Sequence, residues 1–407
     1  MLKGRLRLPL RRVRLLGPLT LAALLLMGAF AGVAHAANPV SGLTVDPLTP
    51  SDAGGARTDY VIHFSTSATG LLTPGQHITI TLPMSSNTTT IVNTVVTDTT
   101  TSTQVGTCGV SSQTIEVCTI SSGKSVADGD HLTVELDGVT NPPQNLTGGQ
   151  QTLSVVTDAD TATATANYSV VAASSITTPT VNNSSPSTAA GARTDYVITF
   201  STSSTGGMSG TAHSQITITF PGTATTPFNT TTIVNAIVTD TTTSTQVGTC
   251  GVSSQTVEVC TISSGKSVTA GDTLKVELDG VTTESPAPVK MADLLTVSTT
   301  SDVNTTTSNP YPVVTAGTIT TPTVNNSSPS TAAGARTDYV ITFTTSGTGG
   351  MSATAHSQIT ITFPGTATTP FNTSTIVNAI VTDTTTSTQV GTCGVSSQTV
   401  EVCTISS

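Results

Sequence analysis

Cysteine pairs are the feature of this 407-residue sequence whose residue type and spacing most directly suggest chemistry. Each of the three pairs has nine residues between its members: Cys108 and Cys118, Cys250 and Cys260, and Cys393 and Cys403. An even cysteine count, distributed as equal pairs in an exported chain, predicts structural disulfides. Closing so short a loop would stabilise the fold by about 2–3 kcal/mol on the chain-entropy account. A redox or metal site is the competing interpretation, but the sequence has no C-x-x-C motif and no histidine recurs beside the pairs.

Acidic residues at recurring positions form the second candidate site, because hard cations such as calcium bind several converging carboxylate oxygens. The candidates are Asp98, Asp240 and Asp383, which occupy the same place relative to the three cysteine pairs. Other acids that keep their places are Asp59, Asp195 and Asp338, and Glu116, Glu258 and Glu401. No dense D-x-D-x-D-G loop is present, and duplication alone would repeat any surface acid. We therefore expect solvated acids of strands and turns, with bound calcium as the alternative and no other cofactor.

An arginine precedes a recurring aspartate by two residues in every copy: Arg57, Arg193 and Arg336. Residues i and i+2 of a strand share a face, but an exposed salt bridge there contributes little, and duplication explains the repetition. His213 and His356 are equivalent, yet no histidine has a counterpart in all three copies. The sequence also lacks a G-x-S-x-G nucleophile motif and a glycine-rich phosphate loop with a lysine. It therefore predicts no catalytic residue and a protein that is not an enzyme.

A long internal repeat determines where these residues lie. The segment 191–198 recurs 143 residues later at 334–341, and a first copy occupies 55–62. A period of this size matches an independently folding domain, so we predict β-sandwich repeats at 38–174, 175–317 and 318–407, called modules 1, 2 and 3 below. Module 3 is incomplete, because Ser407 corresponds to Ser264 and module 2 continues through residues 265–317. We expect the natural product to continue beyond Ser407, or this sequence to be a fragment.

Apolar residues alternate with polar ones along each module, which predicts strands with one buried face. In module 2, Tyr196, Ile198 and Phe200 share one face, and the same alternation recurs in 215–220 and 274–279. Sustained helical periodicity is absent. Roughly seven to nine short strands per module predict an all-β fold of tandem Ig-like, Greek-key β-sandwich domains.

The first 36 residues predict a secretory signal peptide. Six basic residues between Lys3 and Arg14 precede an apolar run over 15–33, and Ala34-His35-Ala36 supplies small residues at the cleavage positions. A retained membrane anchor is the alternative, whereas cleavage leaves no membrane insertion in the mature chain. Cleavage removes six of the 13 basic residues and none of the 23 acidic ones, so the net charge changes from −10 to −16. Binding to nucleic acid or anionic lipid is disfavoured, because both require a basic surface.

Three segments of module 2 carry a resemblance to a known group of proteins. They are 192–200 (ARTDYVITF), 216–222 (ITITFPG) and 270–276 (AGDTLKV). In this order they resemble the Ig-like β-sandwich repeats of large bacterial and archaeal cell-surface proteins, including adhesin-like and S-layer-associated chains. The likeness extends over the mature chain. It implies an exported, wall-associated, stalk-like protein and brings no catalytic residues with it.

We therefore expect a non-catalytic, secreted or cell-surface structural protein that acts as a stalk, spacer or surface-layer component. Short Ser/Thr/Pro segments such as 174–186 would join its modules. Its partners would be the cell envelope or other surface proteins. Two alternatives stay open: an adhesin that binds a ligand through module loops such as 204–212 and 347–355, and the non-catalytic N-terminal part of an exported enzyme.

Overall fold

Strands make up nearly all the regular structure of the chain. The computed structural model describes residues 38–143, 149–222, 227–285, 290–365 and 371–406, and of residues 290–292 it describes the backbone only. The predicted signal peptide, 1–36, lies outside this part. The helices described are two single turns, η1 (Thr230–Thr232) and η2 (Thr373–Thr375), so the predicted all-β fold is confirmed. Within the same ranges, the structure contains no apolar helix of membrane-spanning length.

Module 1 is built from nine antiparallel strands that form a sandwich. They are β1 (Ser41–Val45), β2 (Arg57–Ser65), β3 (His77–Thr81), β4 (Asn93–Asp98), β5 (Thr103–Ser112), β6 (Ile115–Ile120), β7 (His131–Thr140), β8 (Gly149–Thr157) and β9 (Ala164–Val170). Their order is β1-β2-β7-β4-β5-β6-β3-β8-β9. Strands β4, β5 and β6 follow one another as hairpins and β7 returns beside β4, which is the Greek-key arrangement. A bridge between Pro39 and Ala162 brings the two ends of the sheet together.

Module 2 repeats this order strand for strand. Its strands are β10 (Thr180–Ser185), β11 (Arg193–Ser201), β13 (Gln215–Thr219), β14 (Asn235–Asp240), β15 (Thr245–Ser254), β16 (Val257–Ile262), β18 (Thr273–Thr282), β20 (Thr296–Thr299) and β21 (Thr306–Thr307). They lie in the order β10-β11-β18-β14-β15-β16-β13-β20-β21. Two short ladders are added: β12 (Met208–Ser209) pairs with β17 (Ser267–Val268), and β19 (Lys290–Asp293) pairs with β22 (Tyr311–Val313).

The period-two pattern of the sequence correctly predicts the core-facing side chains. In β2, Tyr60, Ile62 and Phe64 are buried and the residues between them are partly exposed; β11 repeats the pattern position for position. The hydroxyl of Tyr60 donates a hydrogen bond to Asn141 Oδ1 at 2.7 Å. The polar end of this buried ring therefore has a partner, as burial of tyrosine requires.

The prediction that 174–186 is a linker is wrong, because most of this segment belongs to the fold of module 2. Strand β10 occupies its second half and pairs with β11. Ile176, at its start, is 4% exposed and lies in the core of module 2. The connection between modules 1 and 2 is therefore shorter than the composition suggests. The exact module boundaries stay predictions.

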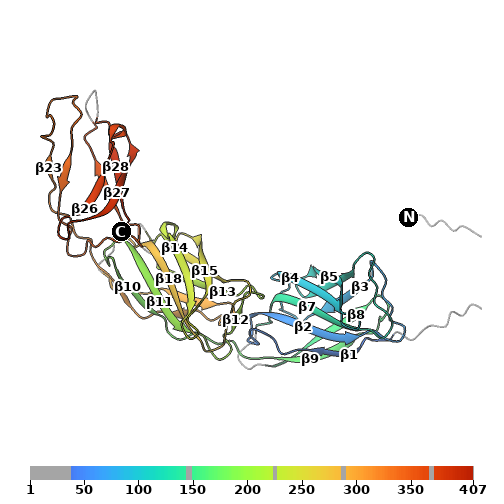
Figure 1. Cartoon of the computed structure of the whole chain (residues 1–407). Coiled ribbons are helices and arrows are strands. Elements are labelled where there is room, and N and C mark those ends of the chain that lie inside the picture. The colour runs from blue at the N-terminus through green and yellow to red at the C-terminus, as the bar shows by residue number, and fades with distance from the viewer. Residues whose placement is uncertain (1–37, 144–148, 223–226, 286–289, 366–370, 407) are drawn as a thin grey trace, which may run out of the picture.

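In its described residues, 318–365 and 371–406, module 3 has fewer strands than module 1 or 2, in two separate groups. One pair consists of β23 (Thr323–Asn325) and β24 (Val340–Thr342), and the other group is a four-stranded sheet in the order β25-β28-β27-β26. These four strands are β25 (Gln358–Thr362), β26 (Ile380–Asp383), β27 (Thr388–Ser397) and β28 (Val400–Ile405). Tyr339 is 36% exposed here, whereas its counterpart Tyr196 is fully buried. Figure 1 shows the three modules following one another along a bent row, with module 3 at the red end.

Candidate functional site at the module junctions

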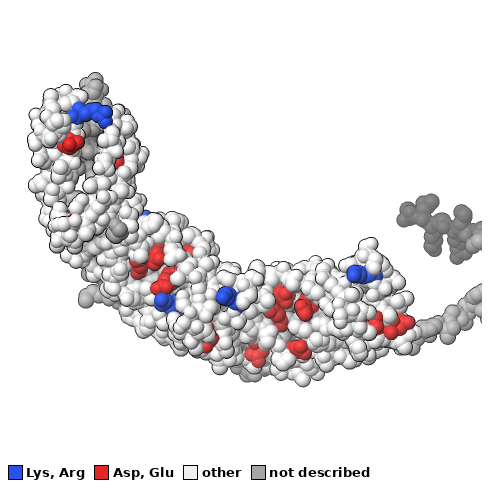
Figure 2. All heavy atoms as spheres, in the orientation of Figure 1, with Lys and Arg blue, Asp and Glu red and all other residues white. Residues whose placement is uncertain are grey.

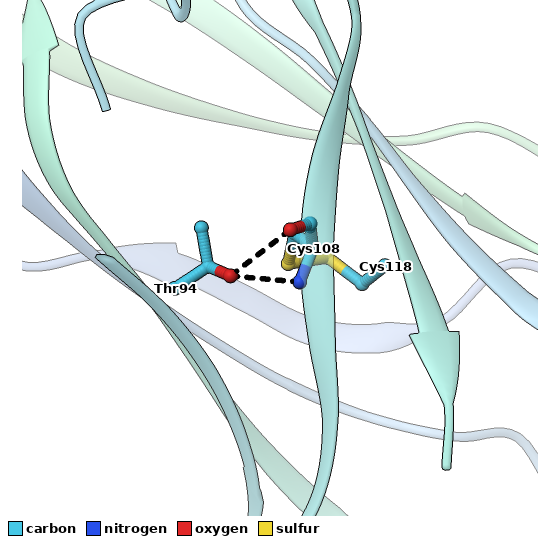
Figure 3. Close-up of a disulfide and its surroundings, with 3 residues drawn as sticks. All are labelled: Thr94, Cys108 and Cys118. Atoms are coloured by element: carbon cyan, nitrogen blue, oxygen red, sulfur yellow. Dashed lines mark hydrogen bonds between the residues drawn. A yellow bond between two sulfur atoms is a disulfide. The ribbon is translucent and has the colours of Figure 1, made fainter. Parts of the chain in front are cut away.

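The three predicted disulfides are present: Cys108–Cys118, Cys250–Cys260 and Cys393–Cys403. In module 1 the bridge joins residues directly opposite each other on β5 and β6. Figure 3 shows Thr94 of β4 beside it: the Thr94 hydroxyl accepts a hydrogen bond from Cys108 N (2.8 Å) and donates one to Cys108 O (3.1 Å). Each bridge thus staples a hairpin. All six cysteines are used, so none is left as a reactive thiol.

The calcium candidates Asp98, Asp240 and Asp383 belong to equivalent turns of three different modules. Asp98 is 1% exposed, and its carboxylate accepts hydrogen bonds from Thr100 N (2.9 Å) and the Thr101 hydroxyl (2.6 Å). Asp240 is bound in the same way in module 2. The expectation of solvated acids is wrong for these two, because each carboxylate is folded into its own turn. In the part of the chain that the structure describes, no three His, Cys, Asp or Glu side chains converge as metal ligands, and calcium remains a hypothesis.

The recurring glutamates are also buried, against the same expectation. Glu116 and Glu258 are 0% and 1% exposed, and Glu401 is 3% exposed. Glu116 shares the inward face of β6 with Cys118, so the alternation of that strand predicts its burial better than its charge does. Loss of water raises the pKa of Glu258 to about 7, although a hydrogen bond with Thr230 opposes the shift. Burial raises the pKa of Glu116 in the same direction.

The Arg-x-Asp segment lies where one module meets the next, and Asp59 joins the two. Its Oδ1 accepts a hydrogen bond from Gly138 N at 3.0 Å, within module 1, and its Oδ2 accepts one from the Thr211 hydroxyl of module 2 at 2.8 Å. Gly138 sits at a β-bulge of β7 with φ of 91°, which side-chain-bearing residues rarely adopt. The bulge glycine therefore fixes one carboxylate oxygen of Asp59 and leaves the other for the next module.

Arg57 crosses the same junction. Its Nη2 donates to Thr90 O at 2.5 Å, and its Nε to Gly138 O at 3.4 Å, both in module 1. Its Nη1 donates to the carbonyl of His213 in module 2 at 3.3 Å. The expectation of an exposed salt bridge between Arg57 and Asp59 is wrong. Both side chains are partly buried, and each forms hydrogen bonds with residues of modules 1 and 2. His213 takes part through its backbone, which has a left-handed conformation with φ of 50°.

Close packing accompanies these hydrogen bonds. The hydroxyl of Ser51 in module 1 donates to Thr205 O of module 2 at 2.6 Å. Gly207 of module 2 lies against Pro50 of module 1, and a Cβ atom on Gly207 would come within 2.4 Å of Pro50 O. Real Cβ atoms do not approach a backbone oxygen so closely. The position therefore has to be glycine for the two modules to meet in this way.

The junction between modules 2 and 3 repeats these contacts. They are Thr354 to Asp195 (2.6 Å), Arg193 to His356 O (3.2 Å), Ser187 to Thr348 O (2.5 Å), and Gly350 against Pro186. The segments that form the two junctions are repeated in the sequence: 55–62 is identical to 191–198, and 206–214 differs from 349–357 at one position. The recurrence of the same contacts in both singles these residues out as the junction set.

Burial at the junction changes the protonation of its carboxylates. The pKa of Asp59 is raised to about 6, first because burial removes water and then because Asp137 lies nearby. Hydrogen bonds from Thr211 and Gly138 oppose the shift. The pKa of Asp195 is raised for the same leading reason. The hydrogen bonds from Thr211 and Thr354 add to the docked arrangement, each by about 1 kcal/mol or less because these bonds are exposed.

The sequence analysis identifies the Arg-x-Asp segment and His213 separately and does not predict that they meet at a junction. One feature of the sequence does point to the junction. The loop 206–213 is two residues longer than its counterpart in module 1. The residue of module 1 at the place of Gly207 is Leu71, which is 48% exposed. The longer loop, 206–213 in module 2 and 349–356 in module 3, therefore occurs in the two modules that follow another module, and module 1 has a shorter loop in its place.

Comparison with known proteins gives no family for this chain, because no family model and no curated protein matches it. Among solved structures, it is similar to the C-terminal domain of the AgI/II polypeptide BspA of Streptococcus agalactiae, at 10% identity and a TM-score of 0.23 over 68% of this chain and 96% of that one. It is also similar to the serine-rich repeat adhesion glycoprotein Srr1 of Streptococcus agalactiae, at 11% identity and a TM-score of 0.26 over 69% and 98% of the two chains. TM-scores this low carry no argument about function.

Proposed function

We propose that this chain is a secreted or cell-surface, non-catalytic structural protein, a stalk or spacer whose modules are locked head to tail. One observation carries the proposal: two successive junctions are held by the same set of side chains. A modular chain without such a set would have freely reorienting domains, as small polar interfaces usually allow. A head-to-tail contact that repeats along a chain builds an extended array, which is the shape that a spacer needs.

The junction loops bear on the adhesin alternative. The loop segments 204–212 and 347–355, expected there as ligand-binding loops, contain the junction residues Thr211 and Thr354, which bind the preceding module. A ligand on these loops would have to compete with that module. The stalk proposal is therefore favoured over ligand binding by these loops.

The surface is consistent with a spacer that has few charged partners. Figure 2 shows a face on which most atoms belong to uncharged residues, with acidic side chains in small groups and basic side chains in isolated spots. Partners in the cell envelope would then be recognised through uncharged polar and apolar contacts. We propose no nucleic-acid partner, because a basic surface is the basis of such binding.

Small-angle X-ray scattering of two matched glycine variants tests the junction. Gly207→Ala adds a Cβ atom that clashes with module 1, whereas Gly251→Ala, in β15 of the same module, meets no atom within 4 Å. We expect the wild type and Gly251→Ala to fit one fixed arrangement of modules 1 and 2, and Gly207→Ala to require a broad set of arrangements. A wild-type profile that itself requires many arrangements would refute the proposal, as would an unchanged profile for Gly207→Ala.

A further inference from the structure

A second segment of module 2 also contacts module 1. It is the turn 299–303, which follows β20 and is called the head turn below. The backbone N–H of Arg57 in module 1 donates to Thr300 O at 2.8 Å, across the junction. A Cβ atom on Gly55 of module 1 would lie 3.5 Å from the Val303 side chain, an ordinary van der Waals distance. The head turn therefore adds a main-chain hydrogen bond and an apolar neighbour to the junction set.

Ser301 supports the part of the junction that Gly207 forms. Its hydroxyl donates to Gly207 O at 2.5 Å, and Ser301 is fully buried. A buried hydrogen bond of this kind restrains the backbone of Gly207, which packs against Pro50 of module 1. Module 1 has Ala159 at the place of Ser301, and alanine has no hydroxyl to donate. Between modules 1 and 2, Ser301 is thus a positioning residue of the module that docks.

The turn 157–161 of module 1 is the counterpart of the head turn, because Asp158 N donates to His77 O as Thr300 N donates to Gln215 O. Its chemistry is different. The Asp158 carboxylate accepts hydrogen bonds from His77 N at 2.9 Å and from His77 Nδ1 at 3.0 Å. The two side chains of this pair are 44% and 46% exposed. Covering them with another module would remove water from an ion pair, a cost that Thr300 does not carry.

Two further positions distinguish the same end of the two modules. Thr161 replaces Val303, and Thr161 is exposed whereas Val303 is partly buried. Leu71 replaces Gly207, where a Cβ atom alone would come within 2.4 Å of Pro50 O. This end of module 1 therefore lacks both the apolar contact and the space on which the junction depends.

We propose that the head turn and Gly207 form a recognition surface for the end of a module that carries the Arg57 and Asp59 positions, with Thr300, Ser301 and Val303 determining specificity. The surface of module 2 fits such an end, and the corresponding surface of module 1 rejects it through a clash and an ion pair that docking would desolvate. The inference rests on the proposed function, because it specifies which module can follow which in the spacer. The array then has one direction of assembly.

Hydrogen–deuterium exchange of the Arg57 amide in the full chain tests this recognition. Its hydrogen bond crosses the junction, whereas the amide of Asp59 is bonded within module 1 and serves as the internal reference. The test variant gives module 2 the turn of module 1: Thr300→Asp/Ser301→Ala/Val303→Thr. Module 1 folds with these residues at the same places, so the turn itself should form. We expect the Arg57 amide to exchange at least about tenfold faster than in wild type, with Asp59 unchanged.

Two further variants separate the contributions. Ser301→Ala removes only the hydroxyl that supports Gly207, and we expect about fivefold faster exchange of the Arg57 amide. The matched control, Asp158→Thr/Ala159→Ser/Thr161→Val, gives module 1 the turn of module 2. The changed turn lies outside the junction, so the exchange of the Arg57 amide should equal that of wild type.

Unchanged exchange of the Arg57 amide in the test variant would overturn the inference, as would equal acceleration in the matched control. Acceleration at Asp59 as well would also overturn it, because module 1 would then be opening locally. Fast exchange of Arg57 in wild type would mean that the modules are not docked, and the proposed function would fail with it. Acceleration by Gly207→Ala but not by the test variant would refute the role of the head turn and leave the proposed function standing.

Discussion

The hydroxyl of Thr211 in module 2 donates a hydrogen bond of 2.8 Å to Asp59 in module 1, across 152 positions of the sequence. Thr354 and Asp195 form the same bond at 2.6 Å one junction further along. A carboxylate that looks like half of a surface ion pair in the sequence is thus a partly buried acceptor between two domains. For the proposed spacer, these contacts between modules would set the stiffness of the chain.

Removing the threonine hydroxyl should uncouple two modules. Thr211→Val keeps the shape of the side chain and leaves Asp59 Oδ2 without its donor. We expect the coupling free energy of modules 1 and 2 to fall by about 0.5–1.5 kcal/mol, the net contribution of one hydrogen bond that water can partly replace. Differential scanning calorimetry measures this as a separation of the two unfolding transitions.

Thr354→Val is the matched control for that substitution. It should weaken the coupling of modules 2 and 3 and leave that of modules 1 and 2 unchanged. Identical calorimetric profiles for wild type and Thr211→Val would mean that the hydrogen bond does not couple the modules.

The junction should become less stable as the pH rises through about 6. Burial raises the pKa of Asp59 from an ordinary value of 3.8 to about 6, so the folded state binds its proton more tightly than the unfolded state. The resulting stability is complete below about pH 4 and is lost as the pH rises through about 6. Asp59→Asn removes this titration, so the melting temperature of the variant relative to wild type should increase between pH 5 and pH 7. Parallel curves for the two proteins over this range would contradict the assignment.

The strands could be predicted because the information is local. Tyr60, Ile62 and Phe64 show by their spacing alone which face is buried, and the equal spacing of the cysteine pairs indicates the disulfides. The junction could not be predicted, because it brings together Asp59 and Thr211 from different modules. No rule of periodicity says which ends of two sandwiches meet.

The buried acids show a different reason for failure. Asp98 is buried because its own turn closes over it with hydrogen bonds from Thr100 and Thr101. From its residue type alone, an aspartate is expected to be solvated. The folded turn shows that hydrogen bonds to the Asp98 carboxylate replace water. The alternation of β6 indicates that Glu116 is buried, whereas the charge of a glutamate alone indicates exposure.

Calcium should have no effect on stability, because the turn itself satisfies the candidate carboxylate. Asp98→Ala is expected to lower the free energy of unfolding by about 1–2 kcal/mol through loss of the turn hydrogen bonds. Asp128→Ala, at an exposed position, is the control and should change little. For each of the three proteins, the thermal unfolding midpoint measured with calcium should equal the midpoint measured with a chelator. A midpoint that calcium raises in wild type but not in Asp98→Ala would restore the calcium hypothesis.

Neutralising Glu258 should stabilise module 2 at alkaline pH. The side chain is 1% exposed and its Oε2 has no hydrogen-bond partner among the residues that the structure describes, so its ionised form is poorly solvated. Burial raises its pKa from 4.5 to about 7, which means that the folded state holds the proton and loses stability as the pH rises through about 7. Glu258→Gln cannot ionise, and we expect urea denaturation at pH 8 to show a gain of about 1–2 kcal/mol that is absent at pH 4.5.

Glu277→Gln is the matched control, because Glu277 is partly exposed and its carboxylate lies 3.0 Å from Lys275 Nζ. It should show no gain at pH 8. A gain of equal size in both variants would indicate relief of the general negative charge. Destabilisation of Glu258→Gln at both pH values would mean instead that the carboxylate has a bonding role that an amide cannot fill.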